Sequence, residues 1–129
     1  MSSRRVVVTG LGLISPVGNT VESGWNAICN GKSGIGPITA FDVSGLATRI
    51  AGEIRDFDVT EYISGKEARR YDQFLHYGLA AGQQAMAEAG MLDEDHGLDP
   101  ERVGFAIGSG IGGISAIEEN MMIYRDRGA

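Results

Sequence analysis

The turn that follows the first apolar run constrains the fold of this chain more than any other segment. Three β-branched residues, Val6 to Val8, predict a short buried strand of the kind found in parallel sheets. This strand leads into Gly10-x-Gly12, the beginning of a dinucleotide-binding fingerprint, but Ser15 stands where the third glycine belongs and Pro16 follows it. Because proline disfavours the helical conformation at the residue before it, no helix runs through this turn. The segment therefore predicts a tight glycine turn out of a buried strand, and it disfavours a nucleotide site.

Strand-like and helix-like stretches alternate along the rest of the chain. Asn19 and Glu22 have capping-box spacing and predict a helix that stops at Asn30-Gly31. The further elements that we expect are a loop over residues 31–47, a strand over 48–54, a long helix from the capping box Ser64-x-x-Glu67 to Gly90, a strand over 102–107 and a last helix from Ile114. This alternation predicts an α/β fold with a parallel sheet, without a repeat or an internal domain boundary in residues 1–129.

Two glycines interrupt the apolar face of the long predicted helix. Gly78 and Gly82 lie at the same four-residue spacing as its apolar side chains. Glycine inside a helix costs about 1 kcal/mol relative to alanine, so a compensating reason is expected. We predict that another backbone approaches this face closely.

Charge and composition argue against several kinds of function. The formal net charge of -6 argues against broad nucleic-acid binding. No stretch approaches the roughly twenty apolar residues that cross a membrane. The single cysteine, Cys29, has no partner for an intrachain disulfide, which suits a reducing cytoplasm. No group of Cys and His residues has metal-ligand spacing, so no metal site is expected.

The second glycine-rich turn, Gly108 to Gly113, is the other prominent motif. It resembles a phosphate-binding loop but lacks the Lys-Ser/Thr pair, since Ile114-Ser115 follows. Its glycines favour close backbone packing, with Ile111 as the lone apolar side chain of the turn.

The residues that often carry catalysis form no recognisable constellation. We expect Cys29 to be a buried, unreactive thiol on an apolar helical face, because no histidine lies near it in sequence. The remaining candidates are expected to be ordinary structural or solvated residues: His76 in the long helix, His96 in an acidic loop and the pair Glu118-Glu119 on the last helix.

With both glycine motifs placed, the chain resembles the amino-terminal part of a β-ketoacyl-acyl-carrier-protein synthase, the elongating type II enzyme of bacterial fatty-acid synthesis. The runs that carry the resemblance span nearly the whole chain in the family's order: Arg4-Arg-Val-Val-Val-Thr-Gly-Leu-Gly12, Ser15-Pro-Val-Gly-Asn-Thr-Val-Glu-Ser23, Lys66-Glu-x-Arg-Arg70, Ile107-Gly-Ser-Gly-Ile-Gly-Gly113 and Ile117-Glu-Glu-Asn120. The resemblance implies the thiolase fold and a homodimer. It further implies that residues 1–129 hold only the first part of the amino-terminal half, about three strands with flanking helices, and are an incomplete domain.

The resemblance also implies an activity and assigns residues to it. Such an enzyme condenses an acyl group, held on a cysteine, with malonyl-carrier protein and releases carbon dioxide, without a cofactor. The nucleophilic cysteine, two histidines and lysine of that site have no match here, so this chain alone is expected to be inactive. Ile111 matches the isoleucine that gates the acyl pocket. Lys66, Arg69 and Arg70 match the basic patch that receives the acidic acyl carrier protein, a partner that relieves repulsion among clustered like charges.

Two other hypotheses stay in view. The first is a non-catalytic relative, such as a polyketide chain-length-factor subunit, which shares the fold but lacks the nucleophile. The second is a Rossmann-type dehydrogenase, which the first glycine turn suggests and Ser15-Pro16 disfavours. A cysteine at the nucleophile position of a longer reading frame favours the enzyme over its relative, and tight binding of a nicotinamide cofactor favours the dehydrogenase.

Overall fold

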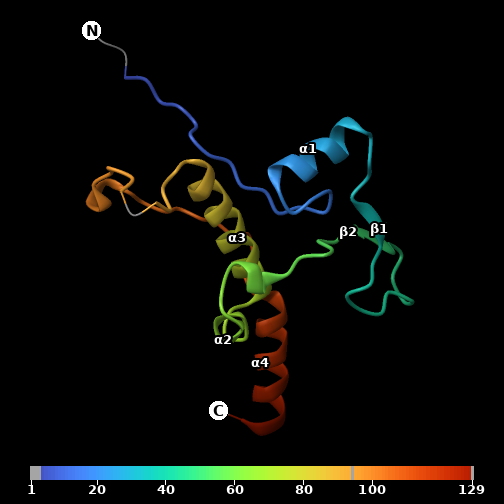
Figure 1. Ribbon diagram of the computed structural model, residues 1–129. Helices are drawn as coiled ribbons and strands as arrows, with labels where there is room; N and C mark the ends of the chain where they lie inside the picture. Colours follow the sequence, from blue (N-terminus) through green and yellow to red (C-terminus); the bar gives the residue numbers. More distant parts are fainter. Residues whose placement is uncertain (1–3, 94, 129) are drawn as a thin grey trace.

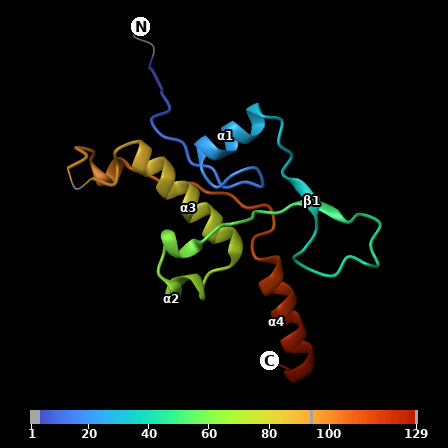
Figure 2. The ribbon, with the colours of Figure 1, turned by 45° about the vertical axis from the view of Figure 1, so that its right-hand side comes forward.

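Helix α3, Gln73–Glu88, is the axis around which the other segments are arranged. The computed structural model describes residues 4–93 and 95–128. In both ribbon views the N-terminal segment runs beside α3, while α4 extends away from the N-terminal end of α3 (Figures 1 and 2). Helix α1 and a small sheet lie to one side (Figure 1). The other elements, in chain order, are α1 Val21–Cys29, β1 Ile35–Pro37, β2 Ile50–Gly52, the 3-10 helix η1 Val59–Glu61, α2 Gly65–Ala68, the 3-10 helix η2 Pro100–Arg102 and α4 Ile114–Arg127.

The glycines of the first turn let the N-terminal segment lie directly on α3. A side-chain carbon at Gly10 would overlap the backbone carbonyl of Ala85, and one at Gly12 would overlap that of Ala81. The Gln84 side chain adds a hydrogen bond, accepted from a backbone N–H of the same segment at 3.1 Å. The space beside these glycines is filled by α3, so the turn is a packing motif.

The glycines within α3 have a different role from the predicted one. A side-chain carbon at Gly78 would lie 3.4 Å from the Ile107 side chain, and one at Gly82 would meet nothing within 4 Å among the described residues. The close backbone approach that we predicted for this helix does occur, but Gly10 and Gly12 of the neighbouring segment make it.

Helix α1 begins one residue later than predicted. Its capping box is formed by Thr20 and Ser23, whose side chains each accept from the other residue's backbone N–H at 3.1 Å. Asn19 and Glu22 do not form the predicted box, because the Asn19 amide donates instead to two backbone carbonyls just before η1, at 2.8 and 3.1 Å. The helix stops as predicted, at Gly31 with its left-handed φ of 67°.

The two strands that pair in the described residues are short and antiparallel. Gly36 of β1 lies opposite Ala51 of β2, and the Ile38 N–H extends the ladder by donating to the Arg49 carbonyl at 3.0 Å. Strand β2 falls within the predicted strand 48–54, whereas β1 lies in the stretch 31–47 that was predicted to be a loop. The sequence therefore located one strand of this pair and missed its partner.

The prediction of a parallel three-stranded sheet is wrong for the described residues. Val6–Val8 and residues 103–107 do not form strands, and a gap of about 290 Å³ lies between Thr9-Gly10, α3 and residues 103–107. A strand requires a neighbour whose N–H and C=O groups complete the ladder. Neither segment has such a neighbour among the described residues, and the side chains of Val6 and Phe105 are exposed.

The long predicted helix is divided into α2 and α3. Ser64 and Glu67 form the predicted capping box, and α2 ends at Ala68. Asp72 then caps α3, with Oδ1 accepting from the Gln73 N–H at 2.7 Å. Helix α3 ends as predicted before Gly90, which has a φ of 68°.

Few apolar side chains are buried in the described residues. The buried ones are Ala27 of α1 and Ala80 of α3, and larger apolar residues such as Trp25 are exposed. A small aromatic cluster joins η1 to α3, with ring centroids 5.9 Å apart for Phe57 and Tyr62 and 5.2 Å apart for Phe57 and Tyr77. Burial there raises the pKa of Tyr77. None of the described helices combines the length and the apolar character that a membrane span requires.

Candidate functional site

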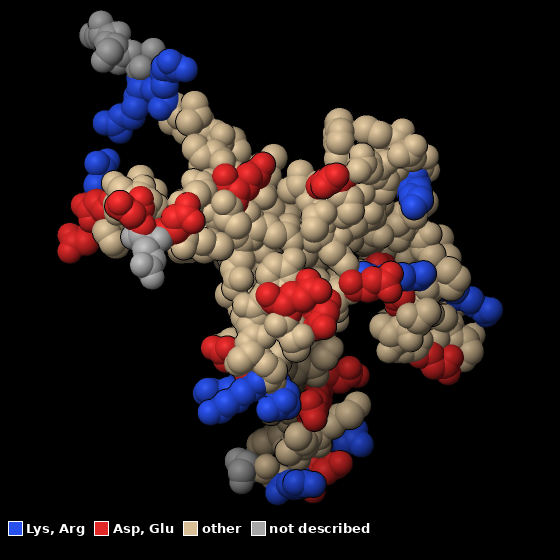
Figure 3. All heavy atoms as spheres, in the orientation of Figure 1, with Lys and Arg blue, Asp and Glu red and all other residues tan. Residues whose placement is uncertain are grey.

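The three predicted docking residues form one exposed basic surface on and just after α2. We call Lys66, Arg69 and Arg70 the basic surface; all three side chains are exposed. Figure 3 shows blue side chains gathered in the lower part of the view, where Figure 1 places α2. None of the three makes an ion pair in the part of the chain that the structure describes. The structure therefore brings the predicted residues together and leaves their charges open to a partner.

The capping box fixes the shape of this short helix. The Ser64 N–H donates to Glu67 at 3.1 Å, and the Ser64 hydroxyl donates to the same carboxylate at 2.6 Å. The Ser64 hydroxyl, its N–H and the nearby charge of Arg70 together lower the pKa of Glu67. Glu67 is thus held as an anion turned back on the helix start.

His76 attaches α2 to α3. Its Nε2 lies 3.0 Å from the backbone carbonyl of Ala68, the last residue of α2. Because a carbonyl only accepts, Nε2 is the donor in this hydrogen bond. His76 is a half-buried structural residue of α3, in agreement with its interpretation from the sequence, and it holds the basic surface in place.

The second glycine turn presents Ile111 to solvent. The Ile111 side chain is 71% exposed. The Ser109 hydroxyl closes the turn by accepting from the Gly112 N–H at 2.9 Å, and Gly112 has a left-handed φ of 75°. The turn thus fixes its backbone with one side-chain hydrogen bond and one glycine conformation, while the apolar side chain between them stays free.

The glycine turn packs against the N-terminal end of α3, which directly follows the basic surface in the chain. A side-chain carbon at Gly112 would lie 3.7 Å from the Phe74 ring, and one at Gly113 would overlap the Asp72 carboxylate. Asp72 and Phe74 follow Arg70 by two and four residues. Sequence reasoning did not select these two residues, although Asp directly before a helical pattern is a recognised N-cap signal. The structure thereby joins two motifs that are about forty residues apart in the sequence.

The other residues that often carry catalysis are not brought together. The thiol of Cys29 is exposed at the end of α1, which corrects the prediction of a buried thiol: Gly24 and Ala27, not Cys29, form the buried face of that helix. His96 accepts from the Leu98 N–H at 3.0 Å within its own loop. Among the described residues no group of three His, Cys, Asp or Glu side chains is arranged to hold a metal ion. Glu118 and Glu119 are exposed on α4, as predicted.

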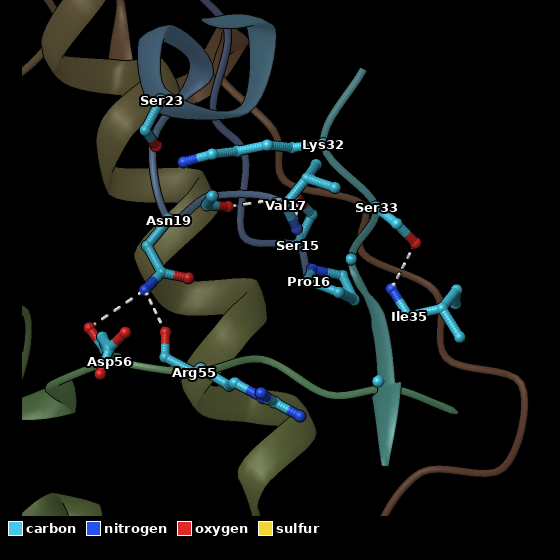
Figure 4. Close-up of a pocket in the computed structure, with 13 residues that line it drawn as sticks. Ser15, Pro16, Val17, Asn19, Ser23, Lys32, Ser33, Ile35, Arg55 and Asp56 are labelled. Atoms are coloured by element: carbon cyan, nitrogen blue, oxygen red, sulfur yellow. Dashed lines mark hydrogen bonds between the residues drawn. The ribbon is translucent and has the colours of Figure 1, made fainter. Parts of the chain in front are cut away.

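A polar hollow of about 490 Å³ lies beside the Ser15–Gly18 turn (Figure 4). Lys32 and Arg55 lie at opposite sides of it in this view, and the Asn19 amide donates to the backbone near Asp56 (Figure 4). Its lining includes neither Ile111 nor any residue of the basic surface. The hollow is therefore separate from the candidate site.

Comparisons with known proteins agree on one family. The sequence model described as Beta-ketoacyl synthase, N-terminal domain, matches residues 3–128. The protein named 3-oxoacyl-[acyl-carrier-protein] synthase 2 from Vibrio harveyi is 52% identical over 129 residues, and its counterpart from Synechocystis is 44% identical over 128 residues. Each match covers 99% of this chain and 30% of the relative. The chain thus spans about 30% of the length of these relatives.

Solved structures of complete ketosynthases contain the same backbone arrangement. The ishigamide ketosynthase/chain length factor superposes with a TM-score of 0.76 at 29% identity, over 97% of this chain and 30% of that one. The structure described as a type II PKS acyl-carrier protein in complex with its ketosynthase, AntDE:AntF, gives a TM-score of 0.70 at 28% identity, over 95% of this chain and 32% of that one. The expected thiolase-like fold is confirmed, although two of the three predicted strands do not form among the described residues.

Proposed function

The chain belongs to the β-ketoacyl synthase family, whose N-terminal domain matches residues 3–128. From this premise we propose that it is the amino-terminal part of a 3-oxoacyl-[acyl-carrier-protein] synthase. The complete enzyme joins an acyl group, held as a thioester on a cysteine outside these residues, to malonyl-carrier protein. Loss of carbon dioxide from the malonyl group leaves a carbanion, which attacks the acyl carbonyl and displaces the cysteine thiolate. The product is a carrier-bound 3-oxoacyl chain, longer by two carbons.

In this proposal the basic surface binds the acyl carrier protein. The observation that carries the proposal is that three exposed cations without an ion pair among the described residues lie just before α3 in the chain, while the Ile111 turn packs against Asp72 and Phe74 at the N-terminal end of α3. An acidic carrier protein that docks on Lys66, Arg69 and Arg70 delivers its acyl chain next to that turn. Positive charges on an exposed face accelerate the association of an acidic partner and select against basic ones. One similar structure contains a ketosynthase with its acyl-carrier protein, which supports this choice of partner.

Ile111 is the gate of the acyl pocket in this proposal. Glycines flank it on both sides in the sequence, so its side chain is the only apolar bulk of the turn. Its exposure of 71% leaves it free to contact a substrate chain delivered at this end of α3. We assign it the control of chain length rather than a chemical step.

Helix α4 supplies the proposed subunit contact. Ile117, Met121 and Tyr124 recur at four- and three-residue spacing and are exposed. An exposed apolar helical face of this kind marks a protein interface. We assign it to the homodimer of the complete enzyme, which sedimentation of the full-length protein and its Met121→Glu variant tests.

We also place the enzyme in the cytoplasm, because the unpaired, exposed thiol of Cys29 suits a reducing compartment.

The second candidate is a chain-length-factor subunit, favoured by one similar structure that contains such a subunit. The higher identities to 3-oxoacyl-carrier-protein synthases favour the enzyme.

The deciding experiment incubates the purified full-length protein with acyl- and malonyl-carrier protein. We expect 3-oxoacyl-carrier product and one carbon dioxide per turnover. Absence of product, together with activation of a separate ketosynthase, identifies the chain-length factor, whereas tight binding of a nicotinamide cofactor would revive the dehydrogenase hypothesis.

A further inference from the structure

One carboxylate oxygen of Asp72 has no role in the proposed function. Oδ1 caps α3 by accepting from the Gln73 N–H at 2.7 Å. Oδ2 is buried and has no hydrogen-bond partner among the described residues. A buried, unpaired carboxylate oxygen is costly, so its position calls for a reason outside the cap.

The second oxygen lies against the base of the glycine turn. Gly113 is the N-cap residue of α4, and a side-chain carbon there would overlap Asp72 Oδ2. No side chain caps α4 by a hydrogen bond. A negative charge beside the first turn of a helix is stabilised by the helix dipole and by the free N–H groups there. Asp72 therefore serves two helices at once, as the cap of α3 and as the anion beside the start of α4.

Phe74 contacts the same turn at Gly112, the residue before Gly113. Its ring would lie 3.7 Å from a side-chain carbon at Gly112, which has a left-handed φ of 75°. Asp72 and Phe74 thus contact the two residues that directly follow Ile111. Because both belong to the N-terminal end of α3, the position of Ile111 depends on that end of the helix.

We propose that Asp72 is a positioning residue for Ile111: its carboxylate holds Gly113, and with it the gate, against the N-terminal end of α3. The part of the inference that concerns chain-length selection rests on the proposed function of Ile111. The part that concerns the order of the turn does not. Asp72 also follows Arg70, the last residue of the basic surface, by two residues in the sequence.

The test uses the full-length enzyme and three substitutions at Asp72. Asp72→Ser keeps a cap for α3 but removes the second oxygen, Asp72→Asn keeps the shape and removes the charge, and Asp72→Glu keeps the charge. Asp58→Ser is the control, because Asp58 is the N-cap residue of η1 and accepts from the Thr60 N–H at 2.8 Å, far from the glycine turn in the sequence. Each protein is compared for amide hydrogen exchange over residues 108–116, for kcat/KM with a short and a long acyl chain, and for carrier-protein affinity.

We expect Asp72→Ser and Asp72→Asn to raise exchange in the turn and to change the long-to-short kcat/KM ratio by about two- to fivefold, the population change that a charge beside a helix N-terminus produces. Asp72→Glu restores part of the ratio, carrier affinity stays constant and Asp58→Ser changes none of the three. Unchanged exchange in the turn overturns the inference. The inference is also overturned if the Asp72 variants leave the long-to-short kcat/KM ratio unchanged while Ile111→Phe changes it.

Failure of the proposed gate has a different signature. If Ile111→Phe leaves chain-length selection unchanged while the Asp72 variants still raise exchange, the gate is wrong and the positioning of the turn stands. If the Asp72 variants do not fold, Gly113→Ala displaces the same contact from the other side. It is expected to raise exchange and change the ratio in the same way, and no effect there overturns the inference.

Discussion

Ile111 is the residue at which local backbone geometry and proposed substrate selection coincide. The turn around it leaves one apolar side chain exposed, while Gly112 needs its left-handed φ of 75° and the residues after it are held by Phe74 and Asp72. Because the backbone after Ile111 is held in place, the volume of its side chain determines how much room remains for an acyl chain. The size of residue 111, rather than its polarity, is therefore the property to vary.

We expect Ile111→Phe in the full-length enzyme to exclude medium and long acyl chains and to spare short ones. Overpacking of a filled site costs about 1–3 kcal/mol, or roughly ten- to a hundredfold in rate or affinity. Acylation rates with a series of chain lengths measure the effect, and decarboxylation of the malonyl group persists because no reacting group is changed. Ile50→Phe adds the same volume on exposed β2 and serves as the control. Equal slowing at every length would mean that Ile111 is not a gate.

At the scale of elements, α2 shows how a four-residue helix gains a fixed shape. It begins with the capping box of Ser64 and Glu67 and ends at the carbonyl that accepts from His76 at 3.0 Å. The two ends are thus tied by side chains, and the cations between and after them are displayed on one face. The basic surface is consequently an organised feature of the fold and not a flexible run of charge.

Reversal of Lys66, Arg69 and Arg70 to Glu is expected to weaken carrier-protein binding by about ten- to a hundredfold at low ionic strength, since each exposed pair contributes about 0.2–1 kcal/mol. The KM for carrier-bound substrates rises, and the dependence of affinity on salt flattens. Binding isotherms at several salt concentrations measure both. A triple reversal of Lys32, Arg49 and Arg102 has the same net charge and is the control. Carrier affinity that is equal in the two triple variants would remove the docking assignment.

Acid is expected to loosen α2 through Glu67. The hydrogen bonds from Ser64 lower the pKa of Glu67 in the folded state below its ordinary value of 4.5. The contribution to stability is therefore fully present above pH 4.5 and is lost as the pH falls through the folded-state pKa. Hydrogen exchange over residues 64–68 of wild type and Glu67→Gln, compared at equal pH, tests this: the two differ near pH 7 and converge as the pH falls through the lowered pKa of Glu67. A difference that persists in acid would place the effect elsewhere.

Most ends of the helices could be predicted from the sequence and the pairing of the strands could not, because their signals differ in range. Capping and stop signals such as Ser64-x-x-Glu67, Gly31 and Gly90 are local, and each one stands where it was predicted. A strand is defined by its neighbour, which for Val6–Val8 lies outside any local pattern. At the site, the resemblance supplied Ile111 and the basic residues. The packing of the Ile111 turn against Asp72 depends on a contact across about forty residues that no spacing in the sequence reveals.

At the scale of the whole molecule, the exposed area is too large for a chain that folds alone. The accessible surface is 10613 Å², whereas a compact monomer of this mass exposes about 6,600 Å². The same open arrangement is found within complete ketosynthases of which this chain covers about 30%. In our proposal the rest of the complete enzyme and its second subunit cover the faces that are open here, and the residues that perform the reaction belong to that remainder.

The 129-residue chain alone is therefore expected not to condense acyl- and malonyl-carrier proteins. No cysteine and histidine are brought together among its described residues, so no activated nucleophile is available to form an acyl-enzyme. Product analysis by mass spectrometry, with the full-length enzyme as the positive control, measures this. A Cys29→Ser variant tells whether any acyl transfer seen with the chain comes from its exposed thiol. Ketoacyl product that survives rigorous purification would show that the chain holds a catalytic site.

The same open surface predicts how the isolated chain behaves in solution. Apolar side chains such as Val8, Phe105 and Met121 are exposed at 78%, 65% and 64%, and exposed apolar surface of this extent drives association. Without a core, unfolding has no cooperative unit to lose, so the heat-capacity trace of the purified chain is expected to lack a sharp transition. Calorimetry and light scattering test this together, and Met121→Glu is expected to reduce association without restoring cooperativity. A soluble monomer that unfolds in one cooperative step would show that these residues form a self-sufficient domain, which contradicts their assignment to part of a thiolase-like half.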